Sequence, residues 1–255
     1  MAKYLAKRIG RSMITLVLVI SIVFCLMRLM PIEGYFSNFD KLTDAQIQAG
    51  LKELGLLDPL PVQLGRFFKN MFHGDFGVST KYRVNVPVTA ILKDKLPVSI
   101  KLGCLSILVS LILGIPLGTM MARFKGKWFD KLGTLFIVFI QAVPAAVYYL
   151  FIQMYGTTLL NIPLLFDASN PRSWILPVFS MSLGNIAYYG MWLRRYMVDE
   201  SNKDYVRLAQ AKGVSENGIM FKHIFRNAFV PMVQYLPSSF LNTVIGSIYV
   251  ESLYS

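Results

Sequence analysis

Residues 98–121 read VSIKLGCLSILVSLILGIPLGTMM, an almost continuous apolar block. The hydrocarbon core of a bilayer is about 30 Å thick and an α-helix rises about 1.5 Å per residue, so a spanning helix needs about 20 mostly apolar residues. The block is long enough to meet that requirement. It predicts a helix that crosses a membrane, and the same pattern recurs along the chain.

Four more segments have this length and apolar character. The predicted spans are Ser12–Met30, Val98–Met121, Leu132–Met154, Trp174–Leu193 and Phe229–Val250. Composition agrees, because only 16% of the residues are charged, against about 25% in an average soluble domain. The alternative for the first span is a signal peptide, but the run is longer than a typical signal core and no small-x-small cleavage site follows it before Pro31. The sequence therefore predicts an all-α polytopic membrane protein with five spans.

The cations are concentrated in particular connecting segments. The net charge is +12, and the N-terminal segment 1–11 carries four cations, segment 122–131 four and segment 194–228 seven. Segment 155–173 carries one cation and one anion. Because cytoplasmic loops of membrane proteins are enriched in Lys and Arg, this pattern predicts a cytoplasmic N-terminus in the inner (cytoplasmic) membrane, with 122–131 and 194–228 also inside. The positive charge is then explained by the orientation of the chain in the membrane, and we expect no nucleic-acid partner.

The long segment 31–97 is nearly neutral, with eight cations and seven anions, and is predicted to be an extracellular helical segment. Apolar spacing predicts one amphipathic helix between Thr43 and Gly55, a second over Val62–Phe72 and a third over Val86–Leu96. A capping domain on the outer membrane face is the simplest interpretation. A docking surface for a substrate-delivery protein remains open as an alternative. The short stretch 251–255 is expected to begin an outer turn.

The inventory of titratable residues excludes two classes of function. Cys25 and Cys104 lie inside predicted spans, and His73 and His223 are the only histidines, so no metal cluster is expected. No predicted span has a carboxylate at its centre. Ion-driven carriers usually bind the coupling ion through an intramembrane acid or base. The sequence therefore argues against a proton-coupled carrier.

Prolines and glycines recur inside the predicted spans, for example Gly114, Pro116 and Gly118 in the second and Pro144 in the third. Proline removes a helix hydrogen bond and kinks the rod, which a membrane protein tolerates where neighbouring helices or a water-filled cavity satisfy the freed groups. Such kinks are typical of a moving transport pathway. Glycines equally allow helices to pack closely.

The cytoplasmic segment 194–228 has the local signals of a helix–turn–helix. Asp204 is predicted to cap a short helix, and the small residues Ala209 and Ala211 leave room for close contact with another surface. Gly213 is suited to the left-handed position that ends a helix. Ser215 is expected to start the next segment. An ordinary solvated connector is the alternative.

The same segment carries a resemblance to a known family. It reads Asp204-Tyr205-Val206-Arg207-x-Ala209-x-Ala211-Lys212-Gly213-x-Ser215-Glu216 and later His223-x-x-Arg226-Asn227-Ala228-x-x-Pro231. This pattern resembles the cytoplasmic signature loop of ABC-importer permeases, and most closely the B-type subunit of dipeptide and oligopeptide importers. The general loop has Glu-Ala-Ala where this chain has Arg207-Leu208-Ala209, and Ile-x-Leu-Pro where it has His223-Ile224-Phe225-Arg226. Both departures are those of the peptide branch.

Other stretches extend the resemblance over essentially the whole chain. They are Tyr4–Ile9, Leu54–Gln63, Gly74–Ser79, Val86–Val88 and Val250–Tyr254. Family members continue beyond the last of these through a Pro-Gly turn into a sixth span. The resemblance therefore implies a type I ABC importer permease fold, with a sixth helix expected to follow.

The resemblance also implies partners. Such permeases pair with a homologous C-type permease, two ABC ATPase subunits and an extracytoplasmic peptide-binding protein. The chain has no Gly-rich Lys-Ser/Thr phosphate loop, so ATP and Mg are expected on the ATPase subunits, with no cofactor and no catalysis on this chain. The expected ATPase-coupling residues are Asp204, Tyr205, Arg207, Ala209, Ala211, Lys212, Gly213, Ser215, Glu216, His223, Arg226 and Asn227.

Uncharged polar residues in the spans are the expected lining of the pathway. The candidates are Gln141, Asn185, Tyr188, Gln234, Ser238, Ser239 and Asn242. Amide and hydroxyl groups suit the backbone of many peptides, although the same groups can bond between helices. Alternatives are a nickel-chelate or glutathione permease of the same branch, a stand-alone channel or carrier, and a membrane-anchored assembly factor.

Overall fold

The computed structural model describes residues 1–36 and 39–254, and it divides into two compact units, Met1–Lys95 and Leu96–Ser255. Residues 37, 38 and 255, which belong to the predicted segments 31–97 and 251–255, lie outside the described residues. The two units are described separately below.

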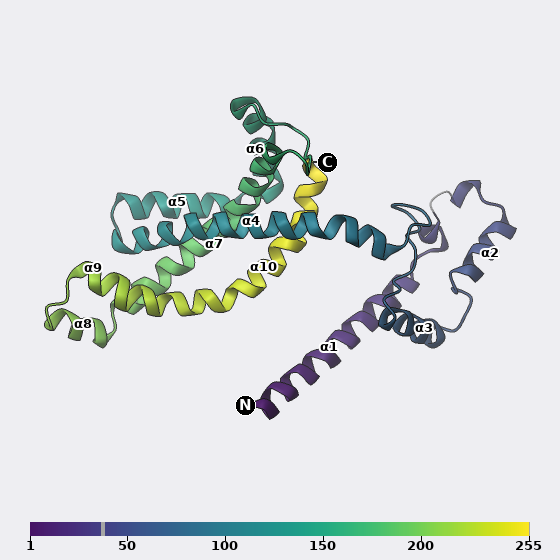
Figure 1. Ribbon diagram of the computed structural model, residues 1–255, viewed down its shortest axis with the longest axis horizontal. Coiled ribbons are helices and arrows are strands. Elements are labelled where there is room, and N and C mark those ends of the chain that lie inside the picture. The colour runs from purple at the N-terminus through teal and green to yellow at the C-terminus, as the bar shows by residue number, and fades with distance from the viewer. Residues whose placement is uncertain (37–38, 255) are drawn as a thin grey trace. The chain divides into compact units, whose positions relative to one another are not determined.

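The first unit begins with the long helix α1 (Ala2–Arg28), followed by the 3₁₀ turns Ile32–Tyr35 and Phe39–Lys41 and by helices α2 (Asp44–Glu53) and α3 (Leu60–Phe72) (Figure 1). Both amphipathic helices predicted between Thr43 and Phe72 are therefore confirmed. Thr43 and Gln46 form a reciprocal capping box at the start of α2. Gly55, at φ +66°, ends it.

The third short helix predicted over Val86–Leu96 does not stand alone. It is the first part of α4 (Val88–Arg123), which continues through Pro97 and Pro116. Each proline removes only one backbone donor, and a long helix with many remaining hydrogen bonds persists through that loss. The predicted boundary at Pro97 is therefore wrong.

The second unit is a helical bundle built around α7 (Ile175–Ser201). Helices α5 (Trp128–Ala142), α6 (Ala145–Leu160) and α10 (Arg226–Tyr254) pack against α7, as Figure 1 shows. The turn Pro171–Trp174 precedes α7. Between α7 and α10 lie α8 (Asp204–Ala211), the single turn α9 (Glu216–Gly218) and a π-helical segment, Ile219–Phe225.

The third predicted span is broken. Val143 has an extended backbone, and the axes of α5 and α6 diverge by 105° across this break. The cause is Pro144, because the proline ring clashes with a helical conformation of the preceding residue. The sequence predicted a kink here, and the structure has a sharp corner.

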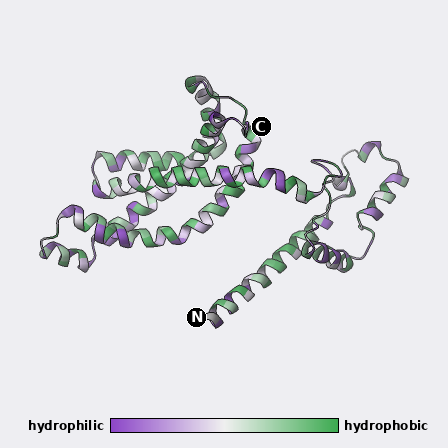
Figure 2. Cartoon of the chain, viewed as in Figure 1, coloured by the Kyte–Doolittle hydropathy of each residue, from purple (hydrophilic) through white to green (hydrophobic). Residues whose placement is uncertain are grey.

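Two helices in the described part of the chain, α1 and α4, are each long and apolar enough to cross a membrane, and the α5–α6 pair makes a third if it counts as one broken span. In Figure 2 the ribbons of α1 and α4 have the colour of hydrophobic residues along much of their length. Helices α7 and α10 have 27 and 29 residues but do not meet the same requirement for a continuous apolar stretch. The total of five spans stays a prediction.

A seam of small residues joins α4 to α7. Ser106, Ser110, Gly114 and Gly118 recur at every fourth position of α4 and are all buried. The Ser106 and Ser110 hydroxyls donate to the carbonyls of Val178 and Ser182, at 3.3 and 3.1 Å. A Cβ atom at position 118 would lie 2.7 Å from the Gly190 carbonyl oxygen and 3.2 Å from its Cα. The glycines of this seam therefore serve close helix packing.

Candidate functional site

The loop between α7 and α10 folds as the predicted helix–turn–helix, but its first helix begins differently. Lys203 occupies the N-cap position without a side-chain cap, and Asp204 is the first helical residue. The prediction that Asp204 caps the helix is therefore wrong by one position. Its carboxylate lies 3.5 Å from the Arg207 guanidinium one turn later, in an exposed pair. A carboxylate in the first turn still favours the helix through the helix dipole.

The turn after α8 is the one that the sequence predicted. Gly213 has φ +73°, and its N–H donates to the Gln210 carbonyl at 2.9 Å while the Val214 N–H donates to the Ala209 carbonyl at 3.1 Å. These two bonds form a Schellman motif, which requires a left-handed residue where Gly213 stands. Ser215 then caps α9 by accepting from the Gly218 N–H at 3.3 Å.

Helix α8 has one face turned inward and one turned outward. Val206 and Ala209 are buried in a cluster with Ile219. The small side chain of Ala209 therefore makes room for the loop's own packing, contrary to the expectation that it faces another surface. The outward face carries exposed residues only, and Leu208 is 56% exposed. This face consists of Asp204, Arg207, Leu208, Ala211 and Lys212.

The remaining predicted loop residues are spread around this core. The Tyr205 hydroxyl donates to Glu200 Oε2 at 2.5 Å, and burial together with this carboxylate raises the pKa of Tyr205. His223 is half-buried. The other predicted residues that are exposed are Lys212, Gly213, Ser215, Glu216, Arg226 and Asn227. The predicted residues thus share one hairpin without forming a single cluster.

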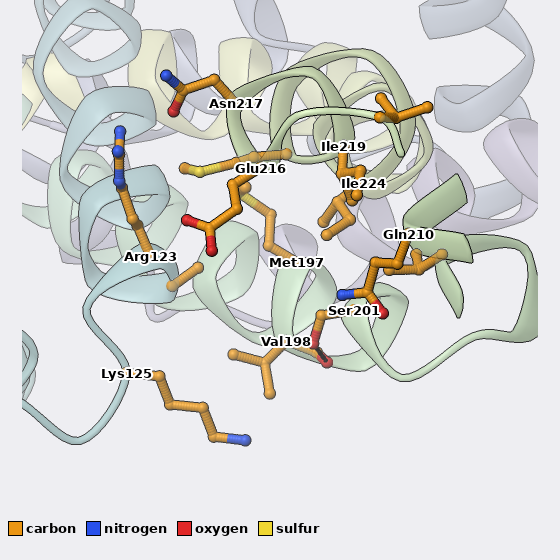
Figure 3. A pocket seen from close by; sticks show the side chains of 14 residues that line it. Arg123, Lys125, Met197, Val198, Ser201, Gln210, Glu216, Asn217, Ile219 and Ile224 are labelled. Atoms are coloured by element: carbon orange, nitrogen blue, oxygen red, sulfur yellow. Dashed lines mark hydrogen bonds between the residues drawn. The ribbon is translucent and has the colours of Figure 1, made fainter. Parts of the chain in front are cut away.

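A cavity of about 450 Å³ lies between the loop and the ends of α4 and α7. Glu216 points into it from the loop, and Arg123 and Lys125 lie on the α4 side (Figure 3). Met197 and Val198 form part of its apolar wall. The cavity separates Glu216 of the hairpin from Arg123 and Lys125.

Sequence reasoning missed an ion pair beside this cavity. Asp130 of α5 is buried and accepts hydrogen bonds from both Nε and Nη2 of Arg194 on α7, at 2.5 and 2.6 Å. It also accepts from the Gly126 N–H at 2.8 Å. The hydrogen bond from Arg194 lowers the pKa of Asp130 below its usual value. The pair ties the α4–α5 turn to α7, eight residues before the hairpin begins.

We expect Asp130→Asn to lower the free energy of unfolding by about 2–3 kcal/mol, because the half-buried Arg194 guanidinium loses its charged partner. Asp199→Asn is the matched control, since Asp199 is exposed on the same stretch of α7. Thermal unfolding in nanodiscs measures both. The stabilisation by Asp130 is complete above the unfolded pKa, near 3.9, and disappears as pH falls through the lower folded value. An equal melting temperature for both variants would contradict a structural role for the pair.

The predicted pathway residues divide into two groups. Asn185 donates to Thr243 Oγ1 at 2.9 Å, and buried Ser239 shares a 2.5 Å hydrogen bond with the Tyr189 hydroxyl. Both therefore bond α7 to α10. Tyr188 stacks on Tyr235 with ring centroids 4.5 Å apart. The residues that remain exposed are Gln141, Gln234, Ser238 and Asn242.

Three of the exposed residues form one stripe. Gln234, Ser238 and Asn242 are spaced four apart, so they share a face of α10. Asn242 also borders a depression of about 190 Å³ between α6, α7 and α10, with Tyr149 and Asn185 on its other walls. The arrangement offers a continuous uncharged polar face without a carboxylate.

The comparisons with known proteins follow this geometry. Residues 114–255 match the model of a family described as the binding-protein-dependent transport system inner membrane component, and residues 1–103 match the N-terminal model of such membrane components. The chain belongs to this family. The resemblance inferred from the loop is thereby confirmed, and so is the expectation of a multi-pass membrane protein of the transport class.

The chain is similar to several named peptide permeases. The dipeptide transport system permease protein DppB of Lactococcus lactis subsp. cremoris is 32% identical over 255 residues, which cover all of this chain and 83% of that protein. The oligopeptide transport system permease protein OppB of Haemophilus influenzae is 28% identical over the whole of this chain and 83% of its own length. The oligopeptide permease AmiC of Streptococcus pneumoniae is 35% identical over 60% of this chain and 31% of its own length.

Proposed function

We propose that this chain is a permease subunit of an ATP-driven importer of dipeptides or oligopeptides. The observation that carries the proposal is the 32% identity to a dipeptide permease along the entire chain. In this proposal the protein lies in the cytoplasmic membrane with its N-terminus inside, because the cations gather in segments 1–11, 122–131 and 194–228.

The hairpin after α7 is the coupling element in this proposal. Its outward face exposes Leu208 between Arg207 and Lys212, which suits a partner groove that is apolar at its centre and acidic at its rim. The partner is an ABC ATPase subunit, one of two that bind ATP and Mg. This chain supplies no phosphate-binding loop. It therefore acts mechanically and is no catalyst.

The polar stripe on α10 is the proposed wall of the pathway. Gln234, Ser238 and Asn242 can exchange hydrogen bonds with a peptide backbone of any sequence, because amides and hydroxyls both donate and accept. A homologous C-type permease would supply the opposite wall. Closure of the ATPase pair would move the hairpins together and rotate the two permeases as rigid bodies, which opens the pathway to the outside. An extracytoplasmic binding protein would deliver the peptide there.

Purification of the tagged protein from its native membrane tests this assembly. We expect a second permease and two ATPase subunits to co-purify, and we expect the ATPase rate to rise when peptide-loaded binding protein is added. The empty binding protein is the control. An isolated chain would instead favour a stand-alone channel or carrier. A complete complex whose ATPase rate ignored the loaded binding protein would exclude the peptide assignment.

A further inference from the structure

We propose that a cavity in the Met1–Lys95 unit binds a small zwitterion, a molecule with one ammonium and one carboxylate group such as a free amino acid or a short peptide. The inference goes beyond the transport function and does not depend on it. It rests on one buried amide, on the charges around it and on the shape of the cavity.

The cavity has a volume of about 320 Å³ and is built by α1, α2, α3 and the turn after α3. This volume is at the lower end of the range of small-molecule sites, which suits an amino acid or a short peptide. The polar residues around it are Arg28, Glu53, Gln63, Arg66, Asn70 and Asp75. Phe67 and Phe76 supply apolar wall.

Gln63 is the buried polar group of the site. Its side chain is held in one orientation, because Nε2 donates to the carbonyls of Leu56 and Asp58 at 3.2 and 2.7 Å. Only 8% of Gln63 is exposed, and its Oε1 atom has no hydrogen-bond partner among the described residues. A buried acceptor without a partner is costly, so an N–H group that reached this oxygen would be favoured.

The charges around the cavity have both signs. Arg66 is fixed by a 2.6 Å ion pair with Asp58, whereas Arg28, Glu53 and Asp75 have no ion pair within the described part of the chain. A simple anion would be repelled by the two carboxylates, and a simple cation by the two guanidinium groups. A zwitterion can direct its ammonium group toward Glu53 and Asp75 and its carboxylate toward Arg28 and Arg66. Arginine binds carboxylates through two parallel N–H groups, which adds selectivity.

Gly55 forms part of the cavity wall. Gly55 has φ +66°, and a Cβ atom at this position would collide with the Arg66 guanidinium. A side chain at this position would therefore displace the end of the Arg66 side chain. Gly55 and Asp75 belong to the stretches Leu54–Gln63 and Gly74–Ser79, which carry part of the family resemblance. The proposed coupling role involves neither stretch.

Binding of alanine and tri-alanine to the full-length protein tests the proposal. The protein is placed in nanodiscs of phosphatidylcholine and phosphatidylglycerol, without binding protein, and saturation-transfer NMR gives the dissociation constants. We expect binding of at least one probe, and binding of N-acetyl-tri-alanine amide, which lacks both charges, to be weaker by about tenfold or more. Alanine binding assigns a free amino acid, and binding of tri-alanine alone assigns a peptide end.

Four variants locate the site. Glu53→Gln and Arg28→Gln should each weaken binding by about tenfold. Glu33→Gln, which changes an exposed carboxylate outside the cavity, should leave it unchanged. Asn242→Ala, on the proposed pathway face, should also leave it unchanged. Loss of binding in Asn242→Ala with full binding in Glu53→Gln would overturn the proposal. So would binding that the blocked peptide retains, or the absence of a response to both alanine probes.

Discussion

Replacing Leu208 with aspartate is expected to reduce peptide uptake by about 100-fold or more while the protein stays folded. Leu208 is 56% exposed on the outward face of α8, so the change disturbs no internal packing. In the proposed complex this side chain enters the groove of an ATPase subunit. A charge placed in a desolvated interface centre costs about 2–4 kcal/mol, which corresponds to roughly 30- to 1,000-fold.

Leu5→Asp is the matched control for this variant. Leu5 is 57% exposed and belongs to another of the predicted cytoplasmic segments, 1–11. We expect its uptake to equal that of the unaltered protein, and we expect the ATPase subunits to co-purify with it but not with Leu208→Asp. Normal uptake by Leu208→Asp would show that the outward face of α8 is not the coupling surface.

Replacing Gly118 with leucine is expected to destabilise the bundle by about 3 kcal/mol or more and to remove most of the protein from the membrane. The Cβ atom alone would lie 2.7 Å from the Gly190 carbonyl oxygen and 3.0 Å from Leu193 Cβ. Because backbone atoms cannot move aside as a flexible side chain can, α4 and α7 must separate. Overpacking of a well-packed core typically costs about 1–3 kcal/mol, and a helix–helix contact through backbone atoms belongs at the upper end.

Gly246→Leu is the control for the seam, since a Cβ atom at position 246 of α10 meets no atom within 4 Å. Both variants add the same side chain to a glycine in a helix interior. Thermal unfolding in nanodiscs should give a melting temperature for Gly118→Leu well below that of Gly246→Leu. Equal melting temperatures would mean that α4 and α7 do not pack at the distance described.

Local features with a strong chemical signal were predictable from the sequence. Gly213 marked the end of α8 because only glycine readily takes the left-handed conformation that the Schellman motif requires. Thr43 marked the start of α2 through its capping box. Pro144 marked a break in the third predicted span. In each case the cause lies within a few residues of the effect.

Features that depend on partners far apart in the sequence were not predictable in the same way. Asp130 and Arg194 are 64 residues apart, and neither residue stands out within its own loop. Asn185 and Ser239 read as pathway residues because they are polar, yet their partners, Thr243 and Tyr189, lie across the α7–α10 contact. Every fourth residue of α4 from Ser106 to Gly118 is small, and this periodic signal could have identified the seam.

The proposed function is tested by uptake of labelled dipeptides and oligopeptides in cells that lack this protein, with nickel and glutathione uptake measured in parallel. We expect peptide uptake to be lost, the intact gene to restore it, and nickel and glutathione uptake to stay unchanged. Unchanged peptide uptake, with nickel or glutathione uptake lost instead, would contradict the assignment of this chain to a peptide importer.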